Sequence, residues 1–469
     1  MAAIRATAAV LILFTAVAAT AECVTTTRLI STRQSQPNLV NGPVAWSGSV
    51  LGVAKRQEGV ATAVWFAVYA EDLQTLVGDR LIANDSRDIV ALEWTGTEFG
   101  LFYRTQNQRL HLQRLTMMGE LIGGPIAITP SRTVYAGDEI DIEWSPVFDA
   151  YVVARDISQG QHKGIWVTFV ERDGAHRTDR KLPVFAAAQS NLSLSVTESG
   201  VVGVFFQNLN GTLSFARMTE TSIPISNAVS QTPGNYIETA AHGNLFVVAH
   251  SVANGPKTEI RWIVVDTSHQ IIRPDVLLLE GSGADVWPLA LISTGEELAL
   301  AYLSTEDRSK PLVTSYRLRR FTIDGTTITD TNFAAAGAGA VTRAESDHDF
   351  VWTGTSYLQA AVRESESLLN SHLQRYCPLR VDIATDVAYG RPGQPVVFTA
   401  MPDGGVPGYT YAWTFGDPQR VFRTQSVART YADTGTYTAT LTVTDTTGAT
   451  VTTTYTVNVV NVKRRSTRF

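Results

Sequence analysis

The stretch Ile89-Val-Ala-Leu-Glu-Trp-Thr-Gly-Thr-Glu-Phe-Gly-Leu-Phe-Tyr-Arg104 decides the fold of this chain. Apolar residues are dense on both sides of Thr95-Gly-Thr97, which interrupts the hydrophobic pattern. The pattern therefore predicts two short strands joined by a tight turn. Close copies of this motif occur at residues 43–49, 142–146 and 350–358, and degenerate copies occur at 194–200, 239–245 and 291–295.

The seven copies recur at a nearly constant spacing. Aligned on the tryptophan of the motif, they fall at Trp46, Trp94, Trp144, Val196, Ala241, Ile292 and Trp352, at intervals of 48, 50, 52, 45, 51 and 60 residues. In the best copy, further strands are predicted at 99–103, 110–115 and 120–122, which makes four in total. This period and strand content are typical of propeller blades. We therefore predict an all-β chain with a seven-bladed β-propeller, whose repeated tryptophan packs between blades.

The seventh copy lacks its fourth strand. Its third strand, at 372–376, repeats the sequence of 111–115, but Cys377 and a proline follow directly. The N-terminal segment 24–31 resembles a lone strand and is predicted to fill the gap, because closing the ring removes free sheet edges. A disulfide between Cys23 and Cys377 would then replace the missing turn. The alternative is two unrelated cysteines, with Cys23 lipidated.

Residues 1–21 are predicted to be a signal peptide, because Arg5 precedes the apolar run 8–18 and Ala19-Thr-Ala21 is a small-residue cleavage site. A retained membrane anchor is the alternative, but the run is too short to span a bilayer. The propeller would then occupy 22–378 of an exported chain with no transmembrane segment. Loss of Arg5 leaves 37 basic and 44 acidic residues, and this mild acidity argues against a nucleic-acid partner.

The pattern changes after the propeller. Residues 413–417 read W-T-F-G-D, and 431–445 read Y-A-D-T-G-T-Y-T-A-T-L-T-V-T-D. With these motifs, segment 379–462 closely resembles a PKD domain, an immunoglobulin-like β-sandwich. The family often has Asp and Gly where this chain has Thr414 and Pro418, so the turn there is expected to be reshaped. The resemblance implies an extracellular, non-catalytic spacer or contact module, and the basic tail 463–469 follows it.

The propeller half resembles the degenerate repeats of exported bacterial β-propellers. It has neither Trp-Asp blade endings nor the S-x-D-x-G-x-x-W boxes of sialidases. Motifs for a serine nucleophile elbow, a zinc-protease helix or a phosphate loop are also absent from the sequence. These absences favour a binding role over a catalytic one, and they predict no obligatory cofactor.

Acidic residues precede several of the predicted innermost strands. Asp88, Asp138, Asp285 and Asp347 lie about six residues before the motif tryptophan position. Because the first strand of every blade lines the central channel, these side chains are candidates for a ligand-binding ring at one channel mouth. They could bind calcium or the hydroxyl groups of a sugar, although no metal can be specified. The alternative is that each carboxylate only stabilises its own turn.

The sequence leaves more than one function open. The favoured prediction is a secreted or cell-surface, non-catalytic binding or adhesion protein whose ligand is a polysaccharide or a protein. The alternative is a polysaccharide-active enzyme, a glycoside hydrolase or lyase, that uses carboxylates at the channel mouth. Glu93 and Glu143, each directly before a motif tryptophan, are the candidates for that role. A purely structural envelope component is a third possibility.

Overall fold

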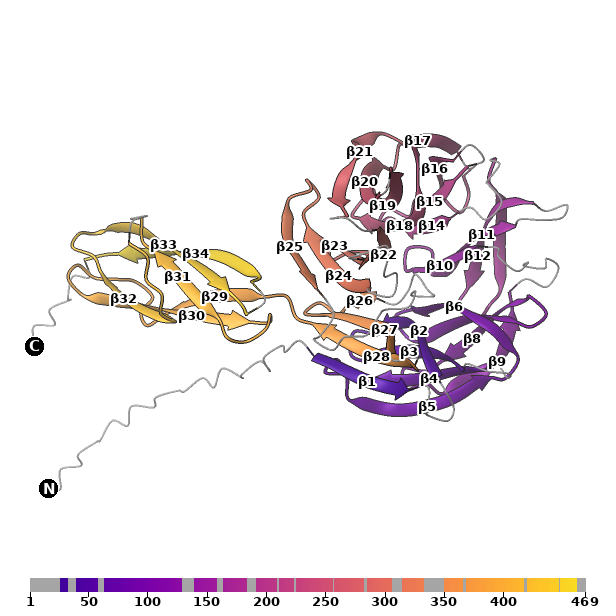
Figure 1. Cartoon of the computed structure of the whole chain (residues 1–469), viewed down its shortest axis with the longest axis horizontal. Coiled ribbons are helices and arrows are strands. Elements are labelled where there is room, and N and C mark those ends of the chain that lie inside the picture. The colour runs from indigo at the N-terminus through magenta and orange to yellow at the C-terminus, as the bar shows by residue number, and fades with distance from the viewer. Residues whose placement is uncertain are drawn as a thin grey trace, which may run out of the picture.

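The computed structural model describes residues 26–32, 39–57, 63–128, 139–157, 163–183, 191–208, 211–222, 225–255, 257–281, 285–305, 314–332, 350–365, 368–416, 420–446 and 448–461. Within these ranges every regular element is a β-strand, and the strands form a ring of sheets followed by a separate sandwich (Figure 1). The predicted all-β fold is therefore confirmed. No helix in the described ranges is long and apolar enough to cross a membrane.

Seven four-stranded antiparallel sheets form the blades of the propeller. Blade 1 contains β2 (Leu39–Trp46), β3 (Leu51–Gln57), β4 (Val64–Tyr69) and β5 (Thr75–Ala83). Blade 2 contains β6 (Ser86–Trp94), β7 (Phe99–Thr105), β8 (Leu110–Leu115) and β9 (Leu121–Ala127). Blade 3 contains β10 (Ile140–Ser145), β11 (Ala150–Ile157), β12 (Gly164–Glu171) and β13 (His176–Lys181). Blade 4 contains β14 (Leu192–Val196), β15 (Val202–Gln207), β16 (Thr212–Met218) and β17 (Ile225–Pro233).

The remaining blades follow the same order. Blade 5 contains β18 (Asn235–His242), β19 (Leu245–Asn254), β20 (Lys257–Asp266) and β21 (Ile271–Glu280). Blade 6 contains β22 (Val286–Ser293), β23 (Leu298–Thr305), β24 (Thr314–Phe321) and β25 (Thr327–Asn332). Blade 7 contains β26 (Phe350–Trp352), β27 (Tyr357–Ser365), β28 (Leu368–Tyr376) and the N-terminal β1 (Thr26–Thr32). The predicted seven blades are thus present.

The turn of the repeated motif has its own chemistry. The Ser or Thr after the motif position accepts a backbone N–H from three residues further on, as in Val50 to Ser47 Oγ (2.9 Å), Glu98 to Thr95 Oγ1 (3.2 Å) and Ser356 to Thr353 Oγ1 (2.9 Å). Gly96 follows Thr95 with a φ of 90°, which a glycine adopts without a steric penalty. This turn returns the chain from the innermost strand of a blade to its second strand.

The propeller is closed by an N-terminal strand that completes its last blade. β1 pairs antiparallel with β28, with Thr26 opposite Arg375 and Thr32 opposite Asn370. The predicted fourth strand of blade 7 is therefore confirmed. Cys377 is buried just after β28, whereas Cys23 and the predicted signal peptide lie outside the described residues. The disulfide accordingly stays a prediction.

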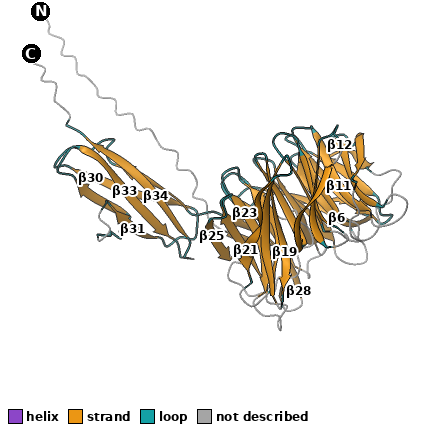
Figure 2. Ribbon diagram, turned by 90° about the horizontal axis from the view of Figure 1, so that it is seen from above, coloured by secondary structure: helices purple, strands orange, loops and turns teal. Residues whose placement is uncertain are grey.

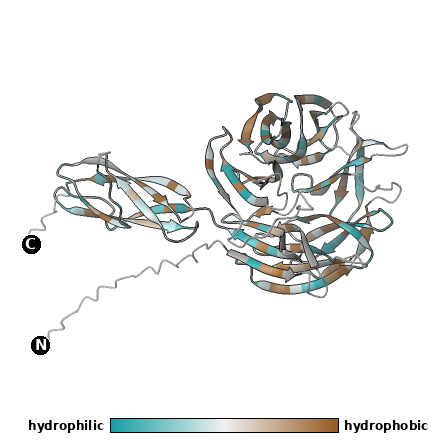
Figure 3. Ribbon diagram, in the orientation of Figure 1, coloured by the Kyte–Doolittle hydropathy of each residue, from teal (hydrophilic) through white to brown (hydrophobic). Residues whose placement is uncertain are grey.

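Residues after the propeller form a two-layer sandwich (Figure 2). One sheet has the order β29 (Arg380–Thr385), β30 (Pro395–Asp403), β32 (Ser426–Thr430), and the other has β31 (Thr410–Thr414), β33 (Gly435–Thr444), β34 (Thr450–Val459). Ala439, Leu441 and Val443 on β33 are fully buried and alternate with threonines. Figure 3 shows hydrophobic and hydrophilic residues interspersed along the strands of both domains. Trp413 fills the core, and its indole N–H donates to the carbonyl oxygen of Thr424 at 3.0 Å.

Candidate functional site

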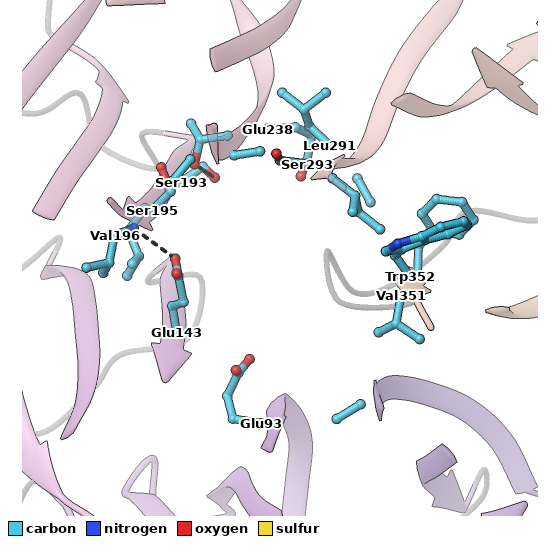
Figure 4. A pocket seen from close by; sticks show the side chains of 18 of the residues that line it. Glu93, Glu143, Ser193, Ser195, Val196, Glu238, Leu291, Ser293, Val351 and Trp352 are labelled. Carbon is cyan, nitrogen blue, oxygen red and sulfur yellow. Dashed lines mark hydrogen bonds between the residues drawn. The ribbon is translucent and has the colours of Figure 1, made fainter. Parts of the chain in front are cut away.

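A cavity of about 750 Å³ lies on the propeller axis (Figure 4). Its wall is made by the innermost strands of all seven blades, β2, β6, β10, β14, β18, β22 and β26, and by several turns that follow them. The predicted convergence of first strands around a central channel is therefore confirmed. The volume falls within the range of about 300–1,000 Å³ that is usual for small-molecule sites.

Carboxylates on blades 2 and 3 cap the innermost strand of the next blade. Such a strand is a sheet edge, so its N–H groups that face the channel need acceptors. Carboxylates of the preceding blade accept three of these N–H groups. Trp144 N–H donates to Glu93 Oε2 (3.3 Å), Leu194 N–H to Asp141 Oδ2 (2.6 Å) and Val196 N–H to Glu143 Oε2 (3.2 Å). These contacts fix the carboxylates in the cavity wall and tie neighbouring blades together.

Side-chain pairs continue this arrangement around the ring. Ser193 of blade 4 and Thr239 of blade 5 share a hydrogen bond of 2.9 Å between their hydroxyl oxygens. His242 of blade 5 contacts the Ser293 hydroxyl of blade 6, also at 2.9 Å. Polar side chains on the innermost strands of blades 2 to 6 therefore form contacts between neighbouring blades.

Aromatic side chains form the other part of the wall. Trp352, Trp46 and Trp94 come from the consecutive blades 7, 1 and 2, and all three are partly exposed in the cavity lining. Figure 4 shows Trp352 across the cavity from Glu143. In blades 1, 6 and 7 the position before the motif residue is Ala45, Leu291 or Val351, so no carboxylate projects there.

The predicted packing role of the motif tryptophans is confirmed by their contacts. Trp94 packs against a core cluster that joins blades 1 and 2, and Trp352 packs against one that joins blades 6 and 7. Trp46 packs with a cluster that joins blades 1 and 7. The sequence did not predict that three of these indoles also line a cavity.

The predicted acidic ring is only partly described by the structure. Asp88 lies on β6 and forms a two-pronged ion pair with Arg104 of β7, with N–O distances of 2.7 and 2.5 Å. Asp285 lies just before β22, and Asp138 and Asp347 lie outside the described residues. The cavity wall uses the later halves of the innermost strands, and neither Asp88 nor Asp285 is part of it. A ligand role for the four aspartates stays a prediction.

The other predicted carboxylates, Glu93 and Glu143, do line the cavity. Two buried carboxylates that the sequence reasoning missed, Asp141 and Glu238, lie with them, each only 7% exposed. The sequence does contain a signal for these two carboxylates. Both stand three residues before a motif position, so they share the strand face of Glu93 and Glu143. Among the described residues there is no group of three or more side chains arranged to hold a metal ion. Calcium binding stays a prediction.

Comparisons with known proteins identify the second domain. Residues 380–459 match the family model described as "PKD domain". The PKD1 domain of Vibrio anguillarum Epp is 29% identical over 18% of this chain and 95% of its own, with a TM-score of 0.15. The match to the family model confirms the predicted PKD resemblance. No curated protein sequence matches this chain.

The propeller resembles solved structures only distantly. The β-propeller domain of the Trilobed protease from Pyrococcus furiosus has a TM-score of 0.46 and 8% identity, over 72% of this chain and 95% of its own. The SapL1 lectin, solved in complex with alpha methyl fucoside, has a TM-score of 0.40 and 10% identity, over 64% of this chain and 97% of its own. Likeness at this level does not transfer a ligand or an activity.

Proposed function

We propose that this chain is an exported, non-catalytic glycan-binding protein whose propeller holds its ligand in the central cavity. The observation that carries the proposal is the two-sided wall, with indole rings on blades 7, 1 and 2 and fixed polar groups on blades 2 to 6. The apolar C–H face of a sugar ring packs on an indole, while its hydroxyl groups donate to carboxylates. The PKD domain serves as a spacer or contact module outside the cell.

The alternative enzymatic function is less well supported. Glycoside hydrolysis by two carboxyl groups usually requires one of them to be protonated as a general acid. Glu93 and Glu143 both accept backbone N–H groups of the next blade, which hold them in place as hydrogen-bond acceptors. Fixed acceptors suit the binding of hydroxyl groups better than proton donation.

A glycan array probed with the labelled full chain tests the binding role. We expect binding to a restricted set of glycans and a loss of about tenfold or more in affinity for Trp46→Ala, because an aromatic wall of the cavity is removed. The matched control is Trp65→Ala on β4 of the same blade, which is outside the cavity lining and should bind normally. Incubating the bound glycans with the protein and measuring new reducing ends tests catalysis. Steady release of new reducing ends would contradict the non-catalytic binding role and support the enzymatic one.

A further inference from the structure

The central cavity is walled on every side by packed blades. A buried apolar cluster fills each of the seven interfaces between neighbouring blades. The cluster between blades 7 and 1, which contains Leu358 and Val53, completes the ring. Close-packed interiors of this kind leave no space through which a sugar unit could pass. Through the described part of the ring, a ligand can therefore reach the cavity wall only along the propeller axis.

The cavity opens at the end of the axis where the turns of the repeated motif lie. Its lining includes Glu198, Gly243 and Gly295, which belong to the turns after β14, β18 and β22. Glu198 and Gly295 are exposed to solvent. With about 750 Å³, the cavity has the volume of a small-molecule site, so it holds a few sugar units. A free chain end can enter such a cavity, whereas an interior segment of a long chain would have to fold back on itself.

Two polar groups of the wall are available to a ligand. Ser195 on β14 lines the cavity and is only 3% exposed, and its hydroxyl oxygen has no hydrogen-bond partner among the described residues. The same holds for the buried indole N–H of Trp46 on β2, which also lines the cavity. A buried polar group without a partner destabilises the fold. A sugar hydroxyl group both donates and accepts hydrogen bonds, so it can pair with either group.

We propose that the cavity binds the free, non-reducing ends of glycan chains and not their interior segments. Hydroxyl groups of the terminal unit pair with Ser195 and Trp46, while its apolar face packs on the indoles of blades 7, 1 and 2. This inference rests on the proposed glycan-binding function and names the part of the glycan that is recognised. Because glycans on cell surfaces are joined to their carriers through the reducing end, the non-reducing end is the one that is free to enter.

A glycan array that presents each determinant in two forms tests this inference. In one form the determinant is the terminal unit, and in the other it is extended at its free end by several units of a different sugar. We expect the labelled full chain to bind the terminal forms at least about tenfold more tightly, which corresponds to about 1.4 kcal/mol. The extension should weaken binding because it keeps the determinant out of the walled cavity.

Two serine variants test the contact with the terminal unit on the same array. Ser195→Ala should lower the affinity for the terminal forms about fivefold, because one hydrogen bond to the ligand is lost. Ser145→Ala is the matched control. The Ser145 hydroxyl on β10 is also buried without a hydrogen-bond partner among the described residues, but it lies outside the cavity lining. This control variant should bind as the parent chain does, and both variants should keep the parent's thermal unfolding midpoint.

The outcomes distinguish this inference from the proposed function. Equal or tighter binding of the extended forms overturns the recognition of chain ends, and so does equal binding by Ser195→Ala and Ser145→Ala. Either result leaves glycan binding in the cavity standing as long as Trp46→Ala binds more weakly than the parent chain. An array on which the parent chain binds no glycan in either form overturns both proposals.

Discussion

At the scale of single residues, blade 5 contains a buried charged cluster. Asp275 on β21 accepts hydrogen bonds from the Ser230 hydroxyl (2.5 Å) and from Arg261 Nε (3.0 Å), and it contacts His250 Nε2 (3.2 Å). His250 is fully buried. Burial acts to raise the pKa of Asp275, but hydrogen bonds from His250 and Ser230 outweigh it and lower this pKa to about 2. The charged carboxylate therefore stabilises the folded state.

The substitution Asp275→Asn tests this contribution. We expect it to lower the free energy of unfolding by about 2 kcal/mol at pH 7, because a pKa difference of one unit corresponds to about 1.4 kcal/mol. The folded-state pKa lies below the unfolded one, so this stabilisation is complete above about pH 4 and is lost as the pH falls towards 2. Urea unfolding followed by tryptophan fluorescence at pH 7 and pH 3 measures both effects.

The control for this prediction comes from the same blade. Glu280 forms an exposed ion pair with Lys257 at 3.5 Å, and such pairs contribute little to stability. Glu280→Gln should therefore change the free energy of unfolding by less than about 0.5 kcal/mol at either pH. An effect of Asp275→Asn that is equally small, or that does not diminish at pH 3, would show that the cluster does not stabilise the fold.

At the scale of secondary-structure elements, neighbouring blades interlock through glycines on their second strands. A Cβ atom at Gly100 of β7 would lie 2.1 Å from the Tyr151 hydroxyl of β11, and one at Gly203 of β15 would lie 2.6 Å from the Phe246 ring of β19. An aromatic side chain from the next blade thus fills the space left by each glycine. Close packing of the blades therefore depends on the absence of a Cβ atom at these two glycines.

The substitution Gly100→Ala should destabilise the propeller by about 1–3 kcal/mol, because the added methyl group forces Tyr151 and blade 3 to shift. Gly124→Ala on β9 is the matched control, since a Cβ atom there meets nothing within 4 Å. Thermal or urea unfolding of both variants measures the difference. Equal stability of the two variants would mean that the interface between blades 2 and 3 relaxes without cost.

At the scale of the whole molecule, the ring depends on contacts between the two ends of the propeller. β1 supplies the outer strand of blade 7, and the Glu71 carboxylate of blade 1 accepts hydrogen bonds from Thr353 (2.7 Å) and Ser356 (2.8 Å) of blade 7. Arg375 of β28 contacts the same carboxylate at 3.3 Å. Because these contacts join residues about 300 positions apart, they form only when the complete ring assembles.

The proposed disulfide would lock this closure covalently. We expect non-reducing peptide mapping of the exported protein to yield one linked peptide pair that contains Cys23 and Cys377. Reduction should lower the free energy of unfolding by about 2–5 kcal/mol, because the bond restricts a long loop in the unfolded chain. In the double variant Cys23→Ser/Cys377→Ser, the reductant should have no effect. Two free thiols in the exported protein would exclude the bond.

The sequence by itself determined the architecture. A blade is built from local hairpins, so its strands, its hydroxyl-stabilised turn at Thr95 and its period of about 50 residues are all encoded within one short segment. The missing fourth strand of blade 7 and the lone N-terminal strand were equally local features. The PKD domain was predictable because its core alternation and turn motifs are contiguous. Glu93 and Glu143 could be placed in the channel because strand alternation fixes their position.

Only the tertiary structure decided how the blades contact one another. The pairing of Glu143 with Val196 N–H spans 53 residues, and no local pattern specifies which edge donor a carboxylate meets. The same applies to Tyr151 against Gly100 and to the indoles that gather on one side of the cavity. Asp88 was a candidate ligand by its position, yet its charge is paired with Arg104 on the adjacent strand. Sequence periodicity gives the spacing of these side chains, whereas their partners depend on the ring geometry that brings separate blades together.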